Sequence, residues 1–497
     1  MRSIPVTRSI LRWLAPALSR VHVFAGHADH APRQIARVGA AVEHAGEPVQ
    51  RGVGVAAAHG FVEGADGCKR FIFVRVFPNS TRYNNCFLIQ ITIVMLTFAQ
   101  VDMNPQERFA SSASAPMPYF TDEHNMLRET VRRFIAERVQ PHADEWEEAG
   151  FVPRDVLREL GSLGLLGIRY SARHGGSELD TLSTAILAEE LGRSTYGGFA
   201  VTVLVHTDMA SPHLFHAGNP AQQDRYMPDI IAGKRIAAVA MTEADAGSDL
   251  ASMRTTARRE GNQWVLNGAK MFITNGVYGD IYFVAAKTGE AGRNHKISMF
   301  IVEKGTPGFR VARPLKKHGW LSSDTAELVF ENCRIPEENL LGEEHRGFYA
   351  LVRNLQNERI VLGAQAIGEA SKAIELALEW VTQRQAFGAT LWDKQTIRHR
   401  LAMRSAQVEA ARTFVYNTAW RDTQGQQVIK EVSMVKALCG TLVNEVMYDC
   451  LQFHGGMGYI RETAIERMSR DARVQAIGGG ATEVMLEEIA KRMQPRS

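Results

Sequence analysis

Hydrophobic positions recur with helical spacing in two parts of the chain and form short runs between those parts. Residues 125–139 place their apolar side chains along one stripe, which predicts a helix that Pro141 ends. Between Arg235 and about Leu341, short runs rich in β-branched and aromatic residues alternate with Gly, Asn and Pro turns, which predicts antiparallel strands. From Arg346 onward, long amphipathic patterns return, as is typical of a helical bundle.

These patterns predict a mainly α fold with a middle β domain: an α-helical N-terminal domain, an antiparallel β domain and a C-terminal four-helix bundle. The 497 residues, 45% hydrophobic and 22% charged, suffice for two or three such domains. The expected boundaries are 1–115 for an extension without an assigned fold, 116–235, 236–345 and 346–497.

The first hundred residues differ from the rest in charge. They hold 11 Lys or Arg against 5 Asp or Glu, which leaves 46 against 49 of the chain's 57 and 54 for the remainder. They also lack a sustained hydrophobic period, so the sequence predicts no regular fold for them.

Three interpretations of this segment stay open. Met1–Arg20 contains arginines and no acidic residue, as in a presequence that would direct the protein to the mitochondrial matrix. The apolar run Cys86–Ala99 is too short for a membrane anchor, which needs about 20 residues, and Gln90 interrupts it, so no stable membrane insertion is expected. We favour the third interpretation, in which translation starts at Met103 and the protein is cytoplasmic, of bacterial type.

Composition and motifs exclude several function classes. The five cysteines form no CxxC pair, which argues against a disulfide framework and against a metal site. Neither a dinucleotide-binding GxGxxG after a strand nor a P-loop occurs. The chain beyond residue 100 is slightly acidic and lacks a basic stripe, so nucleic acid is not an expected partner.

Three loops combine glycine with small hydroxyl and acidic side chains, which lets the backbone approach and bind a ligand: 241–249, 268–276 and 452–459. Each of them alone could be a simple turn. Together with the RQAFG segment 384–388 and residues 470–483, they resemble the acyl-CoA dehydrogenase family over the chain from about Tyr119 onward. The resemblance implies FAD as cofactor and an acyl-CoA as substrate.

The resemblance also assigns the cofactor-binding positions. The loop Val239–Ser248 and the segment around Phe272 correspond to family segments whose backbone and side chains contact the flavin. The RQAFG and 452–456 segments correspond to residues that reach the FAD of a neighbouring subunit. The protein is therefore expected to be a homo-oligomer, with the tetramer as the usual family assembly. The full set is Met241, Thr242, Gly247, Ser248, Phe272, Ile273, Thr274, Arg384, Phe387, Gln395, Gln452, Gly455, Gly456, Thr482 and Glu483.

The reaction requires a carboxylate that removes the α-proton of the acyl thioester. The family places this base at one of two positions, and at the first this chain has Gly479. The second lies on the first helix of the C-terminal domain, as in the long-chain and isovaleryl branches that the chain resembles, and there it has Glu358. Glu358 is therefore the expected catalytic base. Leu351, Leu355, Glu358 and Leu362 step by four, three and four, so the carboxylate falls on an apolar helix stripe, where burial raises its pKa. The alternative is a glutamate that pairs with an arginine or faces solvent.

Family positions also suggest the acyl-CoA contacts, which are listed here: Ser248, Tyr349, Arg359, Gly479 and Gly480, with Asn294 and His295 as weaker candidates. The chain departs from the family pattern at Ala244, where proline is usual, and at Ala481, where a threonine hydroxyl is lost. Phe272 stands where many members have tryptophan.

The predicted function is α,β-dehydrogenation of a long-chain, branched or terpenoid acyl-CoA to the trans-2-enoyl-CoA in fatty-acid β-oxidation. Electrons would pass from FAD to an electron-transfer flavoprotein. Two alternatives stay open at this point: a flavin monooxygenase or oxidase of the same fold, and a non-catalytic acyl-CoA-binding protein.

Overall fold

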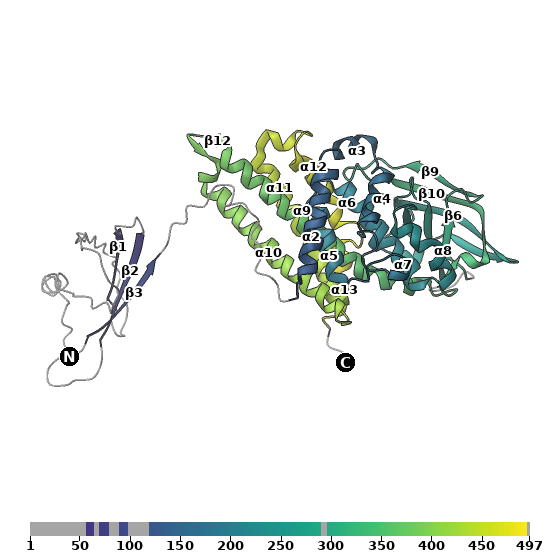
Figure 1. Ribbon diagram of the computed structural model, residues 1–497, viewed down its shortest axis with the longest axis horizontal. Helices are drawn as coiled ribbons and strands as arrows, with labels where there is room; N and C mark the ends of the chain where they lie inside the picture. Colours follow the sequence, from purple (N-terminus) through teal and green to yellow (C-terminus); the bar gives the residue numbers. More distant parts are fainter. Residues whose placement is uncertain (1–55, 64–68, 79–88, 98–118, 290–295, 495–497) are drawn as a thin grey trace. The chain divides into compact units, whose positions relative to one another are not determined.

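The computed structural model describes residues 56–63, 69–78, 89–97, 119–289 and 296–494 (Figure 1). The chain divides into two compact units, residues 1–111 and 112–497. No helix in the described ranges is long and apolar enough to cross a membrane.

The described part of the first unit is a three-stranded antiparallel sheet in the order β1–β2–β3. Its strands are β1 (Ala56–Glu63), β2 (Lys69–Pro78) and β3 (Ile89–Thr97). This differs from the expectation of a segment without regular structure, because β2 and β3 are rich in Ile, Val and Phe, which favour strands. The apolar run considered as an anchor contains β3, whereas Met1–Arg20 and Met103 lie outside the described residues.

The second unit begins with the predicted helical domain. The stripe over residues 125–139 forms a helix whose last turn widens to a π-helix at Val139, just before Pro141. The elements are α2 (Asp122–Phe134), η1 (Ile135–Val139), α3 (Ala143–Ala149), α4 (Arg154–Ser162), η2 (Ala172–His174), α5 (Thr181–Gly192), α6 (Gly197–Leu204), η3 (Val205–Ala210), α7 (Ser211–Ala217) and α8 (Pro220–Ile231).

Helix α5 is the centre of this domain. The Asp180 side chain accepts the N–H of Ser183 and so caps its first turn, and all twelve of its residues are buried. A helix that is buried on every side needs neighbours all round; α5 packs against α2 and against two long helices of the C-terminal domain, α9 (Gly347–Gln383) and α10 (Gln395–Thr423).

The middle domain is one eight-stranded sheet that is mostly antiparallel, not wholly so as expected. Strand β4 pairs in parallel with β7, and β5 meets β7 in parallel at one residue pair, because a long excursion separates these strands along the chain. The strands are β4 (Ala237–Ala240), β5 (Thr256–Glu260), β6 (Gln263–Thr274), β7 (Ile281–Lys287), β8 (Ile297–Glu303), β9 (Phe309–Pro314), β10 (Thr325–Pro336) and β11 (Leu340–Leu341), with short 3-10 turns η4 (Leu250–Ser252) and η5 (Glu337–Asn339).

The C-terminal domain is helical, as predicted, and is dominated by the 37-residue helix α9. Near its start, Gly347 lies against Ser298 of β8, and farther along α9 packs between α5 and the helices α10 and α11. The elements are α9 (Gly347–Gln383), β12 (Gln385–Ala386), β13 (Ala389–Thr390), η6 (Leu391–Asp393), α10 (Gln395–Thr423), α11 (Ile429–His454), η7 (Gly455–Tyr459), α12 (Ala464–Ala472), η8 (Arg473–Ala476) and α13 (Thr482–Lys491).

Two glycines set the distance between α5 and α9. A Cβ on Gly368 would overlap with the carbonyl oxygen of Glu189, and a Cβ on Gly192 would overlap with the carbonyl oxygen of Gln365. These atoms are backbone, which cannot move aside as a flexible side chain can. The helices therefore touch along their backbones, and this contact fixes the position of α9.

We expect Gly368→Ala to lower the free energy of unfolding by about 1–3 kcal/mol, because the added methyl group forces the two helices apart. Thermal or denaturant unfolding of the full chain measures this change. Glu379→Ala, at an exposed position of the same helix, is the control and should leave stability nearly unchanged. Equal stability of the two variants would show that the contact between α5 and α9 is not tight.

Candidate active site

Helix α9 carries Glu358 into the interior of the protein. Its side chain is 4% exposed and shares an apolar stripe with the buried Leu351 and Leu362. Burial raises the pKa of Glu358 to about 7; the charge of Asp208 adds to this increase, while Asn354 and Arg359 oppose it. The hydrogen-bond donor to Glu358 is the Asn354 amide, 3.1 Å from Oε1, so Glu358 is neither exposed to solvent nor hydrogen-bonded to an arginine among the described residues.

The glycine turn at residues 478–480 lies beside this part of α9. Gly479 and Gly480 have positive φ angles of 66° and 111°, and a Cβ on Gly479 would overlap with Leu362. The buried Lys436 fixes the turn, because its Nζ donates to the carbonyl oxygens of Gln475 at 2.6 Å and Gly480 at 3.1 Å. The structure thus brings the turn within one helical turn of Glu358.

Arg359 lies at the same junction. It is 9% exposed, and its Nε has no hydrogen-bond partner although it is buried. Burial lowers the pKa of its guanidinium. A buried donor without a partner is costly, which suits an atom that a ligand would satisfy.

Thr482 turns its hydroxyl toward the carbonyl oxygen of Ala476 at 3.4 Å, and Glu483 is exposed in the first turn of α13.

The loop 241–255 is fastened to strand β6 by a buried ion pair. Lys270 Nζ lies 2.8 Å from Glu243 Oε1 and also donates to the carbonyl oxygen of Met241 at 3.0 Å. Glu243 in turn accepts the backbone N–H groups of Arg254 and Thr255. These contacts satisfy the polar groups at the base of the loop. Its tip, which includes Gly247 and Ser248, is exposed.

Phe272 presents a flat apolar surface next to this loop. Its φ of 62° turns the residue out of β6, and it is 65% exposed between the buried Ile273 and Met271, whose backbone bonds Thr242. A Cβ on Gly247 would have open space around it, with nothing within 4 Å. An exposed aromatic ring beside open backbone fits the planar ring system of the expected flavin, which would cover it. Thr274 is half-buried at the end of the same strand.

The other expected cofactor contacts lie at the opposite end of α9. Trp380 and His454 stack with ring centroids 5.3 Å apart, which places the ends of α9 and α11 together. Phe387 is 96% exposed there, in the β12–β13 turn that Figure 1 shows far from β6. The remaining members of this group are also exposed or lie in turns: Arg384, Gln395, Gln452, Gly455 and Gly456.

Helix length shows how far apart the two groups are. Arg384 follows Glu358 by 26 positions, which corresponds to about 39 Å along α9. One chain therefore does not bring Arg384 and Glu358 to the same site. Asn294 and His295 lie outside the described residues, as does the side chain of Tyr349.

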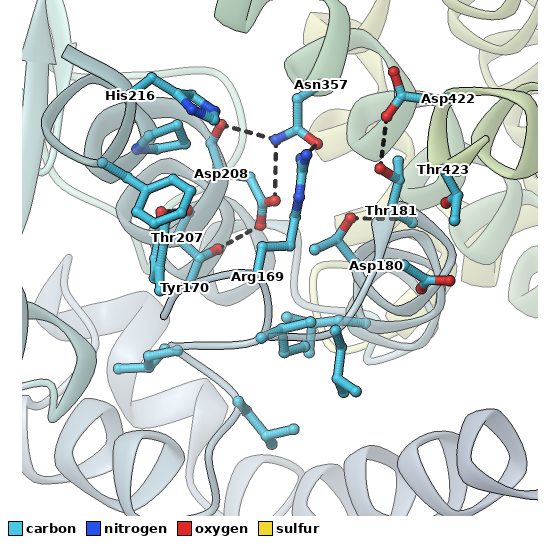
Figure 2. Close-up of a pocket in the computed structure, with 18 residues that line it drawn as sticks. Arg169, Tyr170, Asp180, Thr181, Thr207, Asp208, His216, Asn357, Asp422 and Thr423 are labelled. Carbon is cyan, nitrogen blue, oxygen red and sulfur yellow. Dashed lines mark hydrogen bonds between the residues drawn. The ribbon is translucent and has the colours of Figure 1, made fainter. Parts of the chain in front are cut away.

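A cavity of about 280 Å³ adjoins the α9 segment that carries Glu358 (Figure 2). Its apolar lining comes from α4–η2, α5 and α7, whereas Arg169, Asp208 and Asn357 meet at one wall. Arg169 donates to Asn357 Oδ1, and Asn357 Nδ2 donates to Asp208 Oδ1 at 3.1 Å. Thr181 and Asp422 are hydrogen-bonded at another part of the lining.

The sequence did not single out Asp208, Asn354 or Asn357. Asn354 lies four residues before Glu358 on the same helix, a spacing that does predict a contact. Nothing local predicts Asp208, because it comes from η3, about 150 residues earlier in the chain.

Comparisons with known proteins agree with this architecture. Family models for the N-terminal, middle and C-terminal domains of acyl-CoA dehydrogenases match residues 121–234, 238–333 and 345–494. The chain belongs to the acyl-CoA dehydrogenase family. It is 42% identical to the mitochondrial long-chain specific acyl-CoA dehydrogenase of Mus musculus over 376 residues, 75% of this chain and 87% of that protein. It is 36% identical to the mitochondrial isovaleryl-CoA dehydrogenase of Pongo abelii over 368 residues, 73% and 87% of the two chains.

Solved structures give the same result. The acyl-CoA dehydrogenase of Geobacillus kaustophilus is 37% identical, with a TM-score of 0.74 over 76% of this chain and 100% of that one. The Bacillus anthracis acyl-CoA dehydrogenase complexed with FAD is 32% identical, with a TM-score of 0.71 over 75% and 67%. The protein is an FAD-dependent acyl-CoA dehydrogenase.

We expect Lys270→Met to weaken FAD retention about tenfold or more and to destabilise the fold by about 3–5 kcal/mol, because it leaves Glu243 buried without its cation. The flavin absorbance per mole of purified protein and thermal unfolding measure both effects. Arg310→Ala is the control: Arg310 and Glu331 form an exposed pair at 3.3 Å in the same domain, and such pairs contribute little. Full flavin content in Lys270→Met would show that this pair does not hold the loop.

Proposed function

We propose that the protein dehydrogenates a long-chain, branched or terpenoid acyl-CoA at its α and β carbons, with Glu358 as the base. The observation that carries the proposal is the buried carboxylate on α9, whose pKa of about 7 lies near working pH and which has the glycine turn one helical turn away. Electrons would leave to an electron-transfer flavoprotein.

The chain's own residues perform the proton step. Glu358 in its ionised form removes the α-proton of the thioester and holds it on a carboxylate oxygen. Because Glu358 is buried, the neutral form that results is favoured after the transfer. Bound FAD supplies the acceptor for the β-hydride. Gly479 and Gly480 stay predicted substrate contacts; because they carry no side chain, the turn can pack against Leu362 and Met485 beside the helix that carries the base.

The tip of the loop 241–248 and the Phe272–Thr274 segment would hold the flavin, and Arg359 Nε would find an acceptor in the bound substrate. Thr482 is the candidate replacement for the threonine hydroxyl that Ala481 lacks. Tyr349 and Ser248 stay predicted substrate contacts. The open backbone at Gly247 supports the flavin assignment, and the orphaned guanidinium nitrogen supports the assignment of Arg359.

The acyl class is proposed on two grounds. Glu358 lies on α9, the position that the family resemblance assigns to the base in long-chain and isovaleryl enzymes. The relatives named long-chain and isovaleryl-CoA dehydrogenase have comparable identity to this chain, 42% and 36%. Anaerobic mixing of the yellow protein with palmitoyl-CoA, isovaleryl-CoA, butyryl-CoA and a citronellyl thioester tests this proposal. Bleaching of the flavin by the first, second or fourth supports it, and bleaching by butyryl-CoA alone contradicts it.

We expect Glu358→Gln to keep FAD and lose turnover by about three orders of magnitude or more, because the amide cannot accept the α-proton. In the wild type, kcat/KM should rise with pH through about 7, since only ionised Glu358 is active and its pKa is raised. Glu369→Gln is a matched control: Glu369 is fully buried on the same helix, with a pKa raised to about 8 by burial. Normal turnover in Glu358→Gln would refute the base assignment.

The distance along α9 leads to a second proposal, that the flavin site is shared between subunits. Arg384, Phe387 and the Gln452–Gly456 turn would reach the FAD of a partner copy, within a dimer or the tetramer usual in the family. The exposed aromatic Phe387 is the kind of side chain that an interface buries.

Co-expression of Glu358→Gln and Arg384→Ala chains tests the shared site. If each site takes Glu358 from one chain and Arg384 from its partner, random pairing restores about one intact site in four, although each homodimer is weak. If both residues serve the same chain's site, no pairing restores activity. The specific activity of the mixed preparation, compared with each variant alone, decides between the two arrangements.

A further inference from the structure

The segment η3 is π-helical at the point where it faces α9. Pro212 has no N–H, so the carbonyl oxygen of Asp208 lacks the donor that an α-helix would supply four residues later. The π-helical widening likewise leaves backbone carbonyl oxygens without their usual helical donors on the side of η3 that faces α9. Buried carbonyl oxygens need partners from elsewhere.

Two asparagines of α9 supply these partners. Asn357 Nδ2 donates to the carbonyl oxygen of Asp208 at 3.2 Å. Asn354 Nδ2 lies 3.1 Å from the same oxygen and 3.2 Å from the carbonyl oxygen of Met209. Both asparagines are buried, so η3 and α9 are joined by amide hydrogen bonds that water does not weaken.

The same two amides also reach the carboxylates on either side. Asn354 Nδ2 lies 3.1 Å from Glu358 Oε1, and Asn357 Nδ2 lies 3.1 Å from Asp208 Oδ1. Thr207 Oγ1 donates to the other Asp208 oxygen at 2.6 Å. Asp208 is 2% exposed, so two buried carboxylates share one hydrogen-bond network.

The charged groups around Glu358 come from four helical elements and one loop. Asp208 belongs to η3, Arg359 follows Glu358 on α9, and Arg169 reaches Asn357 from the loop after α4. Lys436 on α11 and the Glu488–Arg492 pair on α13 act on Arg359. Of these groups, Asp208 and Arg359 act on Glu358 directly and with opposite sign, Asp208 against its ionisation and Arg359 in favour.

We propose that Asn354 and Asp208 are positioning residues for Glu358: the Asn354 amide holds the carboxylate in place, and the Asp208 carboxylate sets the charge against which it ionises. The inference rests on the proposed role of Glu358 as base. It adds a function for η3, whose backbone is held to α9 by the same asparagines.

The two residues have opposite electrostatic effects, and this provides a test that a purely structural role would not pass. The acid limb is the part of the pH profile over which the bleaching rate rises as Glu358 ionises. Asp208→Asn removes a negative charge, so this limb should move to lower pH. Asn354→Leu removes a donor to the ionised carboxylate, so the limb should move to higher pH, with turnover reduced on the order of 10- to 100-fold by misplacement of the base.

The measurement is the rate of flavin bleaching after anaerobic mixing with palmitoyl-CoA or isovaleryl-CoA, whichever bleaches the wild type faster, between about pH 5.5 and 9. Asn339→Leu is the matched control, because Asn339 is a buried asparagine that donates to the carbonyl oxygen of Ile301 in the middle domain. It should leave the acid limb unmoved, even if stability falls.

Opposite shifts in the two variants support the inference. Unmoved limbs, or shifts in the same direction, would overturn it. If Asn354→Leu yields no folded protein, the near-isosteric Asp208→Asn still decides. Glu358→Gln is measured alongside, so that failure of the proposed function and failure of this inference can be told apart. An active Glu358→Gln variant rejects the proposed role of Glu358 as base. An inactive Glu358→Gln variant, together with an unmoved acid limb in Asp208→Asn, rejects only the inference about the positioning residues.

Discussion

The close crossing of α5 and α9 is the contact on which the site depends. Gly192 and Gly368 let the two backbones touch, and each would clash with the opposite helix if it carried a Cβ. This crossing fixes α9 relative to the N-terminal helical domain. Because α9 is one uninterrupted helix, its position there also fixes Glu358, η3 and the glycine turn farther along.

Three buried glutamates near this crossing show how partners set the charge of a carboxylate. Glu189 on α5 meets Arg412 at 2.9 Å and Arg128 at 3.1 Å, and these cations outweigh the effect of burial, so its pKa falls to about 2. Glu358 and Glu369 on α9 have amide partners instead, and burial raises their pKa values to about 7 and about 8. Burial therefore raises the pKa of a carboxylate only where close cations do not offset it.

The sequence predicted the order of helical and β domains because hydrophobic periodicity reports directly on which face of an element is buried. It also located Glu358, because the family resemblance assigns the base to that position, and the spacing from Leu351 to Leu362, which places the carboxylate on an apolar stripe, agrees with it. It missed the parallel pairing of β4 with β7, because pairing between distant strands leaves no local pattern. Asp208 and Arg169 were missed for the same reason: they approach α9 from elements far away in the chain.

By itself, the sequence determined the family, the cofactor and the helix that carries the candidate base, because these depend on motifs and on local periodicity. Only the tertiary structure decided which charges surround Glu358, since the effect of a charge depends on distance and burial. The tertiary structure likewise placed Arg384 about 39 Å from that base along α9, with Phe387 in the turn that follows, a separation that follows from the rise of a straight helix. Sequence motifs name the parts of the site, but their distances in the fold decide whether one chain can assemble them.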